Sequence, residues 1–398
     1  MPQKVFVTGM GIISSIGNNC SQNFKSIVEI TPGISDIEIL ETVYRKKFKA
    51  GEIKYSNKQL AEMASGNSDN LTRTALLGMI AAAEAMAHAQ IKNFSDDKTG
   101  FISSTTVAGM CRTELLYGDF LQSKINGSFI ETNDCGDSTE CIADFLGIKN
   151  NITTISTACS SSANAIIHGS RLIKSGKLNR VVAGGTDVLS KFTLNGFHSL
   201  QILDEDWCKP FDENRKGLNL GEGAAYLVLE SEDQVLKEGK KILCEIKGYG
   251  NANDAYHQTA SSPEGTGAFL AMQEAIQTSG INPGEINYIN AHGTGTMNND
   301  LTEGIALKKI FGKNIPAFSS TKSFTGHTLA AAGAVEAVFS ILALTNGLVI
   351  PNLNFSDPIS ALDIIPEKKM VHHADLKYVL SNSFGFGGNC SSLIFGKV

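Results

Sequence analysis

The chain is poor in the residues that characterise disulfide-rich, fibrous or metal-binding proteins. Its 398 residues include eight cysteines and nine prolines, and only 7% of its residues are aromatic. The cysteines are scattered, with no CxxC pair and no Cys/His spacing typical of zinc sites, so we expect free thiols and no bound metal. No secretory signal pattern precedes the strand-like segment that begins within Met1–Val7, so a cytoplasmic location is expected.

Charge and hydropathy argue against two further classes of protein. A formal net charge of −6 lacks the basic excess that nucleic-acid binding requires, and an acidic protein partner would need a local basic patch on this chain. The longest apolar run, Leu329–Leu344, contains Gly333 and Glu336 and is short for a membrane span. It therefore predicts a buried core helix, and no membrane segment is expected.

The remaining composition is that of a globular α/β protein. Hydrophobic residues make up 42% of the chain and charged residues 19%, and the 39 glycines cluster beside strand-like runs. Short β-rich runs alternate with helical patterns, which is typical of layered α/β folds. The predicted strands are Lys4–Thr8, Gly100–Thr105, Asn151–Ser156, Arg180–Ala183, Ala225–Glu230, Ile286–Asn290, Ala317–Ser320 and Ser392–Phe395. The predicted helices are Thr72–Gln90, Cys159–Ser175, Gly267–Ser279, Asp300–Phe311 and Thr328–Leu344, with Gly176 and Gly280 as C-terminal stops.

Two weak internal sequence similarities predict a duplicated core. Val181–Thr186 and Tyr288–Thr294 are each a strand that ends in small residues, and Gly221–Leu229 and Gly387–Phe395 are each a glycine cluster followed by a hydrophobic strand. The charged segment Ser231–Lys241 would join the two halves, which we place at residues 1–235 and 236–398.

Cys159 is the first candidate for chemistry. It follows a β-rich run and precedes a helical pattern, so it falls at a strand-to-helix turn. Unpaired N–H groups and the positive end of the helix dipole would favour its thiolate there. The alternative is a buried structural cysteine, which is the usual fate of a free thiol.

His292 is the second candidate. It lies in Asn290–Thr296, directly after a predicted strand and beside Gly293, where α/β folds place catalytic groups. A histidine that only hydrogen-bonds within a turn would fit the same pattern.

Lys322 and His327 form the third element, ahead of the apolar helix that carries Glu336. A lone carboxylate in such a helix is costly unless a cation pairs with it, so a Lys322–Glu336 pair is predicted. The pair could be structural only, or it could orient the His327 imidazole and keep it neutral.

Phe386 lies in a fourth element, flanked by glycines in Ser383–Asn389. Those glycines would let the backbone turn sharply and present an N–H toward a ligand, and with the N–H of Cys159 it would form an oxyanion hole. An ordinary glycine-rich turn is the alternative.

Gly9 and Gly11 resemble the opening of a dinucleotide-binding fingerprint after a strand. The third glycine is missing from its required place, and no acidic residue suitably ends a second strand. We therefore interpret this turn as part of the scaffold.

Taken together, these elements resemble the type II β-ketoacyl-acyl-carrier-protein synthases, close to the elongating group of these condensing enzymes. The resemblance extends over the whole chain and is most specific in Ser156–Ser161, Asn290–Thr296, Thr321–His327 and Asn382–Gly388. It implies the thiolase-like fold, with two duplicated α/β halves in a layered αβαβα core. It also implies decarboxylative Claisen condensation of an acyl-Cys enzyme with malonyl-acyl-carrier-protein.

The resemblance also implies residue roles. Cys159 would accept the acyl group, His292 and His327 would promote decarboxylation and stabilise the enolate, and Lys322, paired with Glu336, would orient them. Backbone N–H groups of Cys159 and Phe386 would hold the oxyanion, and Phe386 would also act as a gate. The substrate would be bound by Val107, Phe197, Thr259, Thr294 and Thr296.

The implied partner is an acyl carrier protein that delivers substrate on its phosphopantetheine arm, with no other cofactor, to a homodimer or a heterodimer with a related subunit. Glu62–Arg73 lacks the basic docking helix of the family, and Ile125–Cys141 lacks its Pro- and Phe-rich loop. A specialised aryl-polyene, flexirubin-like or polyketide pathway is therefore an alternative to fatty-acid synthesis.

Three other kinds of protein share parts of this pattern. A non-catalytic chain-length subunit resembles the family but lacks the nucleophile, and Cys159 is present here. A thiolase has the same fold, but the Lys322–His327 motif disfavours it. A Cys/His hydrolase would differ in that water, rather than a carbanion, attacks the acyl-enzyme.

Overall fold

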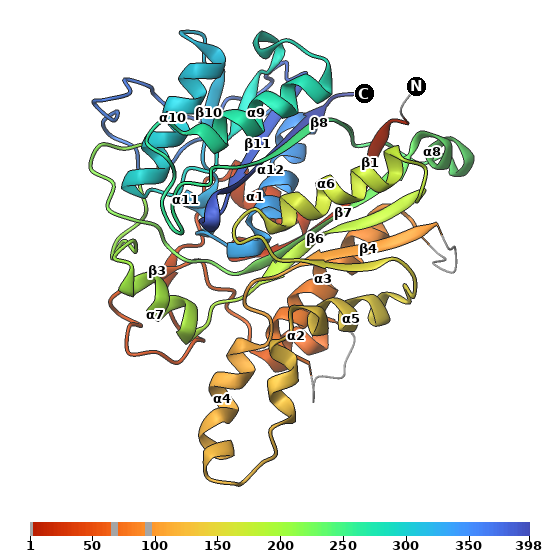
Figure 1. Cartoon of the computed structure of the whole chain (residues 1–398), viewed down its shortest axis with the longest axis vertical. Helices are drawn as coiled ribbons and strands as arrows, with labels where there is room; N and C mark the ends of the chain where they lie inside the picture. Colours follow the sequence, from red (N-terminus) through yellow and green to blue (C-terminus); the bar gives the residue numbers. More distant parts are fainter. Residues whose placement is uncertain (1–2, 65–70, 92–97) are drawn as a thin grey trace.

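The computed structural model in Figure 1 describes residues 3–64, 71–91 and 98–398. Within these ranges the main sheet has the strand order β10-β9-β11-β12-β8-β1-β7-β6-β4-β5, and β2 pairs with β3 separately. The strands are β1 (Val5–Ser14), β2 (Ser35–Asp36), β3 (Lys49–Ala50), β4 (Thr99–Ser104), β5 (Ile152–Ile155), β6 (Arg180–Asp187), β7 (Gly223–Ser231), β8 (Cys244–Asn253), β9 (Tyr288–Asn290), β10 (Ala317–Ser319), β11 (Tyr378–Phe384) and β12 (Asn389–Gly396).

Helices cover both faces of this sheet. The α-helices are α1 (Cys20–Val28), α2 (Asn57–Met63), α3 (Arg73–His88), α4 (Met110–Leu121), α5 (Cys135–Leu146), α6 (Ser161–Lys174), α7 (Lys191–Ser199), α8 (Glu232–Glu238), α9 (Thr266–Ser279), α10 (Met297–Phe311), α11 (Lys322–Thr325) and α12 (Ala332–Asn346). Short 3-10 helices are η1 (Ser128–Asn133), η2 (Pro283–Glu285), η3 (Leu329–Ala331) and η4 (Phe386–Gly388). Gly280 caps α9 in the left-handed conformation, as predicted.

The strand order repeats between the two halves of the chain. In the first half the order is β5-β4-β6-β7-β1, and in the second it is β10-β9-β11-β12-β8, so equivalent strands occupy equivalent places. The strand directions also repeat, with two parallel pairs followed by two antiparallel pairs in each half. The halves join where β1 pairs with β8 at Phe6 and Val7. The predicted duplicated α/β fold is therefore confirmed.

One of the two internal sequence similarities paired strands that are not equivalent. The first similarity equated β6 with β9, but the strand order makes β6 equivalent to β11 and β9 equivalent to β4. The second similarity equated β7 with β12, which do occupy equivalent places in the sheet. The error arose because many strands end in small residues where they approach a functional site. This pattern therefore does not identify equivalent strands.

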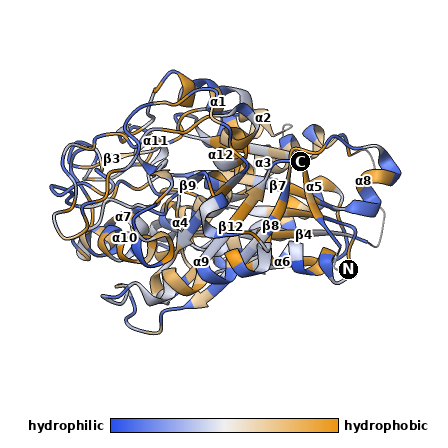
Figure 2. Ribbon diagram, turned by 90° about the horizontal axis from the view of Figure 1, so that it is seen from above, coloured by the Kyte–Doolittle hydropathy of each residue, from blue (hydrophilic) through white to orange (hydrophobic). Residues whose placement is uncertain are grey.

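The core is layered. Helix α3 packs on β1 and β7 on the outer side of one half-sheet, and α9 packs on β8 and β12 on the outer side of the other. Helices α6 and α12 contact each other and lie between the half-sheets, since α12 packs on both β7 and β11. Figure 2 shows hydrophilic segments such as α8 at the periphery of the molecule.

Helix α12 is the predicted core helix. The stretch Leu329–Asn346 is long and apolar enough to cross a membrane by length and composition, but 89% of it is buried inside the protein. Every residue from Ala332 to Leu344 is buried. The prediction of a buried core helix is confirmed.

Gly9 and Gly11 pack β1 tightly onto α3. A Cβ atom would lie 2.3 Å from a backbone carbonyl oxygen of α3 at Gly9 and 2.1 Å from another at Gly11. Gly248 and Gly250 repeat this arrangement, because a Cβ there would lie 2.2 and 2.1 Å from carbonyl oxygens of α9. The paired glycines are thus a duplicated packing feature, which explains the incomplete dinucleotide pattern.

Candidate active site

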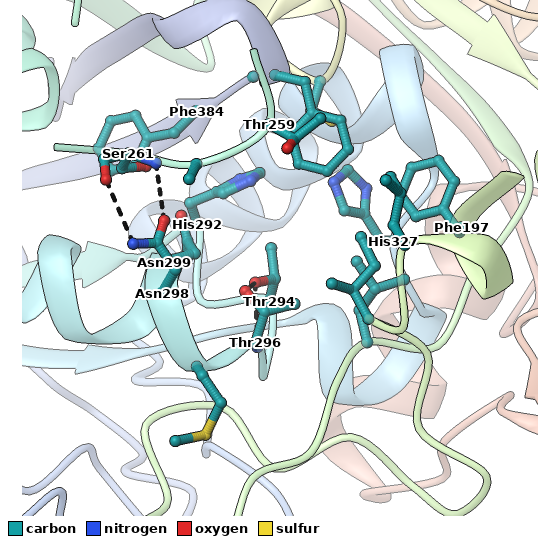
Figure 3. A pocket seen from close by; sticks show the side chains of 18 of the residues that line it. Phe197, Thr259, Ser261, His292, Thr294, Thr296, Asn298, Asn299, His327 and Phe384 are labelled. Atoms are coloured by element: carbon teal, nitrogen blue, oxygen red, sulfur yellow. Dashed lines mark hydrogen bonds between the residues drawn. The ribbon is translucent and has the colours of Figure 1, made fainter. Parts of the chain in front are cut away.

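The predicted reactive side chains line one cavity of about 280 Å³. Cys159, His292 and His327 are in its wall, although they lie on separate segments of the chain. Figure 3 shows the two imidazoles on the same cavity, with the threonine side chains nearby. Among the predicted substrate-binding residues, Phe197, Thr259, Thr294 and Thr296 also line the cavity, and so does Phe386, the predicted gate.

Cys159 lies in the turn between β5 and α6. Its neighbour Ala158 has a φ of 53°, a left-handed conformation that non-glycine residues seldom adopt. Helix α6 begins at Ser161, two positions later than predicted, and Ser160 is its N-cap residue. The turn therefore presents the thiol to the cavity just before the helix starts.

Asn389, a residue that the sequence did not indicate, anchors this turn. Its Oδ1 accepts hydrogen bonds from Ser160 Oγ at 2.7 Å, Asn164 Nδ2 at 2.8 Å and Asn251 Nδ2 at 3.0 Å. Asn389 begins β12 and Asn251 lies on β8, so the second half of the fold positions the nucleophile turn of the first. Because an asparagine carbonyl beside a glycine-rich turn has no distinctive pattern, the sequence carried no signal for this role.

Burial acts against the expected thiolate character of Cys159. Only 7% of the residue is exposed, and desolvation raises the pKa of its thiol to about 11, despite the opposing effects of the Lys322 charge and of the nearby Phe386 backbone N–H. Burial therefore opposes the thiolate that the start of the helix was predicted to favour.

The Phe386 turn brings a backbone N–H close to the Cys159 sulfur, where it lowers the pKa of the thiol. Gly385 has no room for a side chain, because a Cβ there would lie 2.9 Å from the Thr157 carbonyl oxygen. The Phe386 ring stacks on Phe197, with ring centroids 5.7 Å apart and an interplanar angle of 18°. The same residue therefore supplies a donor to the sulfur and an aromatic wall to the cavity.

His292 is held at the end of β9 through its backbone and its ring. Glu303 Oε1 and Oε2 accept from the N–H groups of His292 and Gly293 at 2.9 and 2.8 Å. Lys322 Nζ donates to the His292 carbonyl at 2.6 Å and lies 3.2 Å from its Nδ1. Because Nδ1 accepts from the ammonium, the partners assign the ring proton to Nε2.

His327 reaches the same tautomer through a different partner. The Leu329 backbone N–H donates to its Nδ1 at 3.1 Å, so its ring proton is also on Nε2. The His292 and His327 rings are edge to face, with centroids 5.3 Å apart. In the hydrogen bonds of the described residues, Lys322 orients His292 rather than His327, which corrects one predicted contact.

Both imidazoles are neutral at physiological pH. Burial, followed by the positive charge of Lys322, holds the pKa of His292 and that of His327 well below the ordinary value of 6.5. The cavity therefore contains two N–H donors without a positive charge on either ring.

The predicted Lys322–Glu336 ion pair forms, and both side chains are buried. Burial raises the pKa of Glu336 to about 7, against the opposing effect of Lys322. Within the described part of the chain, Glu336 Oε2 has no hydrogen-bond partner. The carboxylate is thus held by a single cation in a desolvated site.

Two buried acids on α10 were also missed. Glu303 fixes the backbone of His292, and Asp300 accepts from the N–H groups of Thr294 and Gly295 at 2.9 and 3.1 Å. Asn382 Nδ2 donates to Glu303 Oε1 at 3.1 Å from β11. The i, i+3 spacing of these acids directly after the histidine motif was the available signal, since both lie on the helix face that meets that loop.

Val107, predicted near the acyl pocket, is not among the residues that line this cavity. It is buried in the hydrophobic core, and its backbone N–H donates to Asp187 Oδ1 at 3.0 Å. Within Glu62–Arg73, the segment expected to lack a basic docking helix, residues 65–70 lie outside the described residues. In residues 3–64, 71–91 and 98–398, no group of three or more His, Cys, Asp or Glu side chains could hold a metal ion.

Comparison with known proteins agrees with this geometry. Residues 3–235 match the N-terminal domain of β-ketoacyl synthase, and residues 243–356 match its C-terminal domain. The chain is 34% identical to the 3-oxoacyl-[acyl-carrier-protein] synthase 2 of Staphylococcus aureus (strain N315), covering 99% of this chain and 98% of that protein.

Solved structures give the same result. The ishigamide ketosynthase/chain length factor has a TM-score of 0.94 and 29% identity, with both chains covered completely. A type II PKS acyl-carrier protein in complex with its ketosynthase bound to the hexaketide has a TM-score of 0.89 and 26% identity, again over both full chains. The fold is thus thiolase-like, and the chain is an acyltransferase that forms a carbon–carbon bond. It belongs to the β-ketoacyl synthase family.

Proposed function

We propose that this chain condenses an acyl group on Cys159 with malonyl-acyl-carrier-protein, releasing carbon dioxide and giving 3-oxoacyl-carrier-protein. The observation that carries the proposal is the meeting of a buried thiol with two neutral imidazole N–H donors in one cavity. A thioester intermediate divides a difficult condensation into two easier steps.

In the first step the Cys159 sulfur attacks the thioester carbonyl of an acyl-carrier. The Phe386 N–H lies near this sulfur, so with the Cys159 N–H it can hold the carbonyl oxygen as negative charge develops. The new carbon–sulfur bond forms as the bond to the pantetheine sulfur breaks. The proton of the resting thiol ends on the departing pantetheine thiol, so the step leaves the net charge of the site unchanged.

In the second step the malonyl group loses carbon dioxide and becomes an enolate. The two electrons of the broken carbon–carbon bond enter the enolate, whose oxygen accepts from the Nε2–H groups of His292 and His327. The enolate carbon then attacks the Cys159 thioester, and the resulting intermediate expels the sulfur as a thiolate, which takes up a proton from solvent. Lys322 and Glu336 support this step by holding the tautomer of His292.

The acyl and malonyl groups would reach the active site through the same cavity. The acyl and malonyl groups arrive on the phosphopantetheine arm of an acyl carrier protein, with no further cofactor, and Thr259, Thr294 and Thr296 line its path. The names of the relatives support a carrier partner and a dimer, either of two copies or with a chain-length subunit. We place the enzyme in the cytoplasm, in fatty-acid synthesis or a related polyketide or aryl-polyene pathway, with the two halves divided at residues 235 and 236.

The test is intact-protein mass spectrometry after incubation with a panel of acyl-carrier thioesters. The wild-type chain should gain the mass of one acyl group, located on Cys159 by peptide mapping, and the preferred acyl group identifies the primer. Cys159→Ala should gain none, whereas Cys208→Ala, which removes another buried thiol, should still load. Loading of the Cys159→Ala variant would refute the proposal.

A further inference from the structure

Lys216 is the one residue with a permanent charge among the described residues that line the active-site cavity. The rest of the wall consists of apolar, hydroxyl-bearing or amide side chains, glycines, the Cys159 thiol and the two neutral histidines. No aspartate or glutamate is among these lining residues. The ammonium of Lys216 therefore sets the electrostatic potential that an entering ligand meets.

The loop of Lys216 is tied to the start of α10. Its neighbour Arg215 is buried and donates to the Thr296 carbonyl at 3.2 Å and the Met297 carbonyl at 2.8 Å. On the other side, Gly217 is packed so closely that a Cβ would lie 2.4 Å from the Ile202 carbonyl oxygen. Lys216 is exposed between these two buried residues, so its backbone is fixed while its side chain is free to reach a ligand.

In the part of the chain that the structure describes, no protein group is paired with this ammonium. Among residues 3–64, 71–91 and 98–398, Lys216 takes part in none of the side-chain hydrogen bonds or ion pairs of the fold. Cys159 and His292 are buried with 7% and 2% of their surfaces exposed, so Lys216 lies at the solvent end of the cavity and the reactive groups lie at the inner end.

The groups beside Lys216 suit a phosphate. Met297, Asn298 and Asn299 form the first turn of α10 and line the cavity, and first-turn N–H groups have no acceptor within their own helix. A lysine ammonium next to such N–H groups is a common way to bind a phosphate oxygen. Asn298 exchanges hydrogen bonds with the Ser261 backbone at 2.7 and 3.3 Å, which holds the opposite wall in place (Figure 3).

We propose that Lys216 binds the phosphodiester of the phosphopantetheine arm at the cavity entrance and so selects phosphorylated acyl donors over donors without the phosphate. This inference depends on the proposed function, since it assigns one contact of the same arm. The chain has a net charge of −6, so the protein as a whole repels an anionic arm. The positive charge of Lys216 would attract the arm locally, at the cavity entrance.

The test compares acylation of Cys159 by two donors that carry the same acyl group, acyl-phosphopantetheine and acyl-pantetheine. The acyl group is the one that loads fastest from the carrier panel. The measured quantity is the kcat/KM for acyl-phosphopantetheine divided by the kcat/KM for acyl-pantetheine. In Lys216→Gln this ratio should fall by roughly threefold to tenfold, as expected for loss of one exposed charged contact, and Lys216→Glu should lower it further.

Two control variants sharpen the result. Lys216→Arg should retain the wild-type ratio, and Lys237→Gln, the same charge change on α8 outside the cavity wall, should retain it as well. An unchanged ratio in Lys216→Gln would overturn the inference. So would a defect seen only with carrier-bound donors, because it would assign Lys216 to the carrier surface. Failure of both small donors and the carrier panel to acylate the wild-type Cys159 would instead contradict the proposed function.

Discussion

Lys322→Met is the substitution that most directly separates catalysis from stability in this site. The ammonium contacts Glu336, the His292 carbonyl and His292 Nδ1, and only 2% of the residue is exposed. Methionine is an unbranched side chain only one heavy atom shorter than lysine, but it leaves Glu336 buried without its cation. Removing one partner of a buried ion pair lowers the free energy of unfolding by about 3–5 kcal/mol.

The catalytic effect has a separate cause. Without the ammonium, His292 Nδ1 has lost its donor, and the ring can adopt the tautomer that turns an acceptor toward the enolate. Loss of one preorganised donor should slow malonyl decarboxylation roughly a hundredfold to a thousandfold. The double variant Lys322→Met/Glu336→Met removes the stranded carboxylate and should recover most of the stability while decarboxylation stays slow.

The stability effect also depends on pH. Burial already raises the pKa of Glu336 to about 7, and losing Lys322 raises it further. A carboxyl whose folded pKa is above its unfolded value of about 4.5 stabilises the fold below that value, and this contribution is lost as pH rises through the folded pKa.

The free energy of unfolding of Lys322→Met, measured by urea denaturation, should therefore decrease from pH 5 upward relative to the double variant. If the double variant regains decarboxylation together with stability, Lys322 acts only in folding and its positioning role is refuted.

Other perturbations test separate features of the site and the fold. The rate of iodoacetamide alkylation of Cys159, followed by peptide mass spectrometry, should rise about tenfold per pH unit from pH 7 to 10, because the thiol pKa is about 11; a plateau by pH 8 would contradict the buried-thiol assignment. Gly11→Ala and Gly250→Ala should each lower the free energy of unfolding by about 1–3 kcal/mol or more, because the added Cβ meets a helix carbonyl oxygen, whereas Gly284→Ala, with open space around it, should not. Equal stability of all three variants in urea would show that the paired glycines are not packing sites.

The sequence was most informative where chemistry is local to a strand end. Cys159 and His292 were identified from the turns that follow β5 and β9, and the Lys322–Glu336 pair from the cost of a lone carboxylate in an apolar helix. In each case the residue type, its immediate neighbours and the element boundary were sufficient.

The missed features depend on tertiary packing. Asn389 acts by holding the turn of another segment, which leaves no local pattern, whereas Glu303 and Asp300 left only their i, i+3 spacing as a signal. The pKa of Cys159 is set by burial, which appears only when both halves close over the turn. Strands β8 and β11 were not predicted, because β8 is rich in glycine and asparagine and β11 carries buried polar residues such as Asn382, whose hydrogen bonds come from other elements.

The most direct measurement is malonyl decarboxylation by Cys159→Gln, in which the amide stands for the acyl-enzyme. We expect release of carbon dioxide from malonyl-carrier without condensation, and a fall of roughly a hundredfold to a thousandfold when His292→Ala or His327→Ala is added. Decarboxylation that continues undiminished without either imidazole would contradict the claim that these two neutral donors stabilise the enolate.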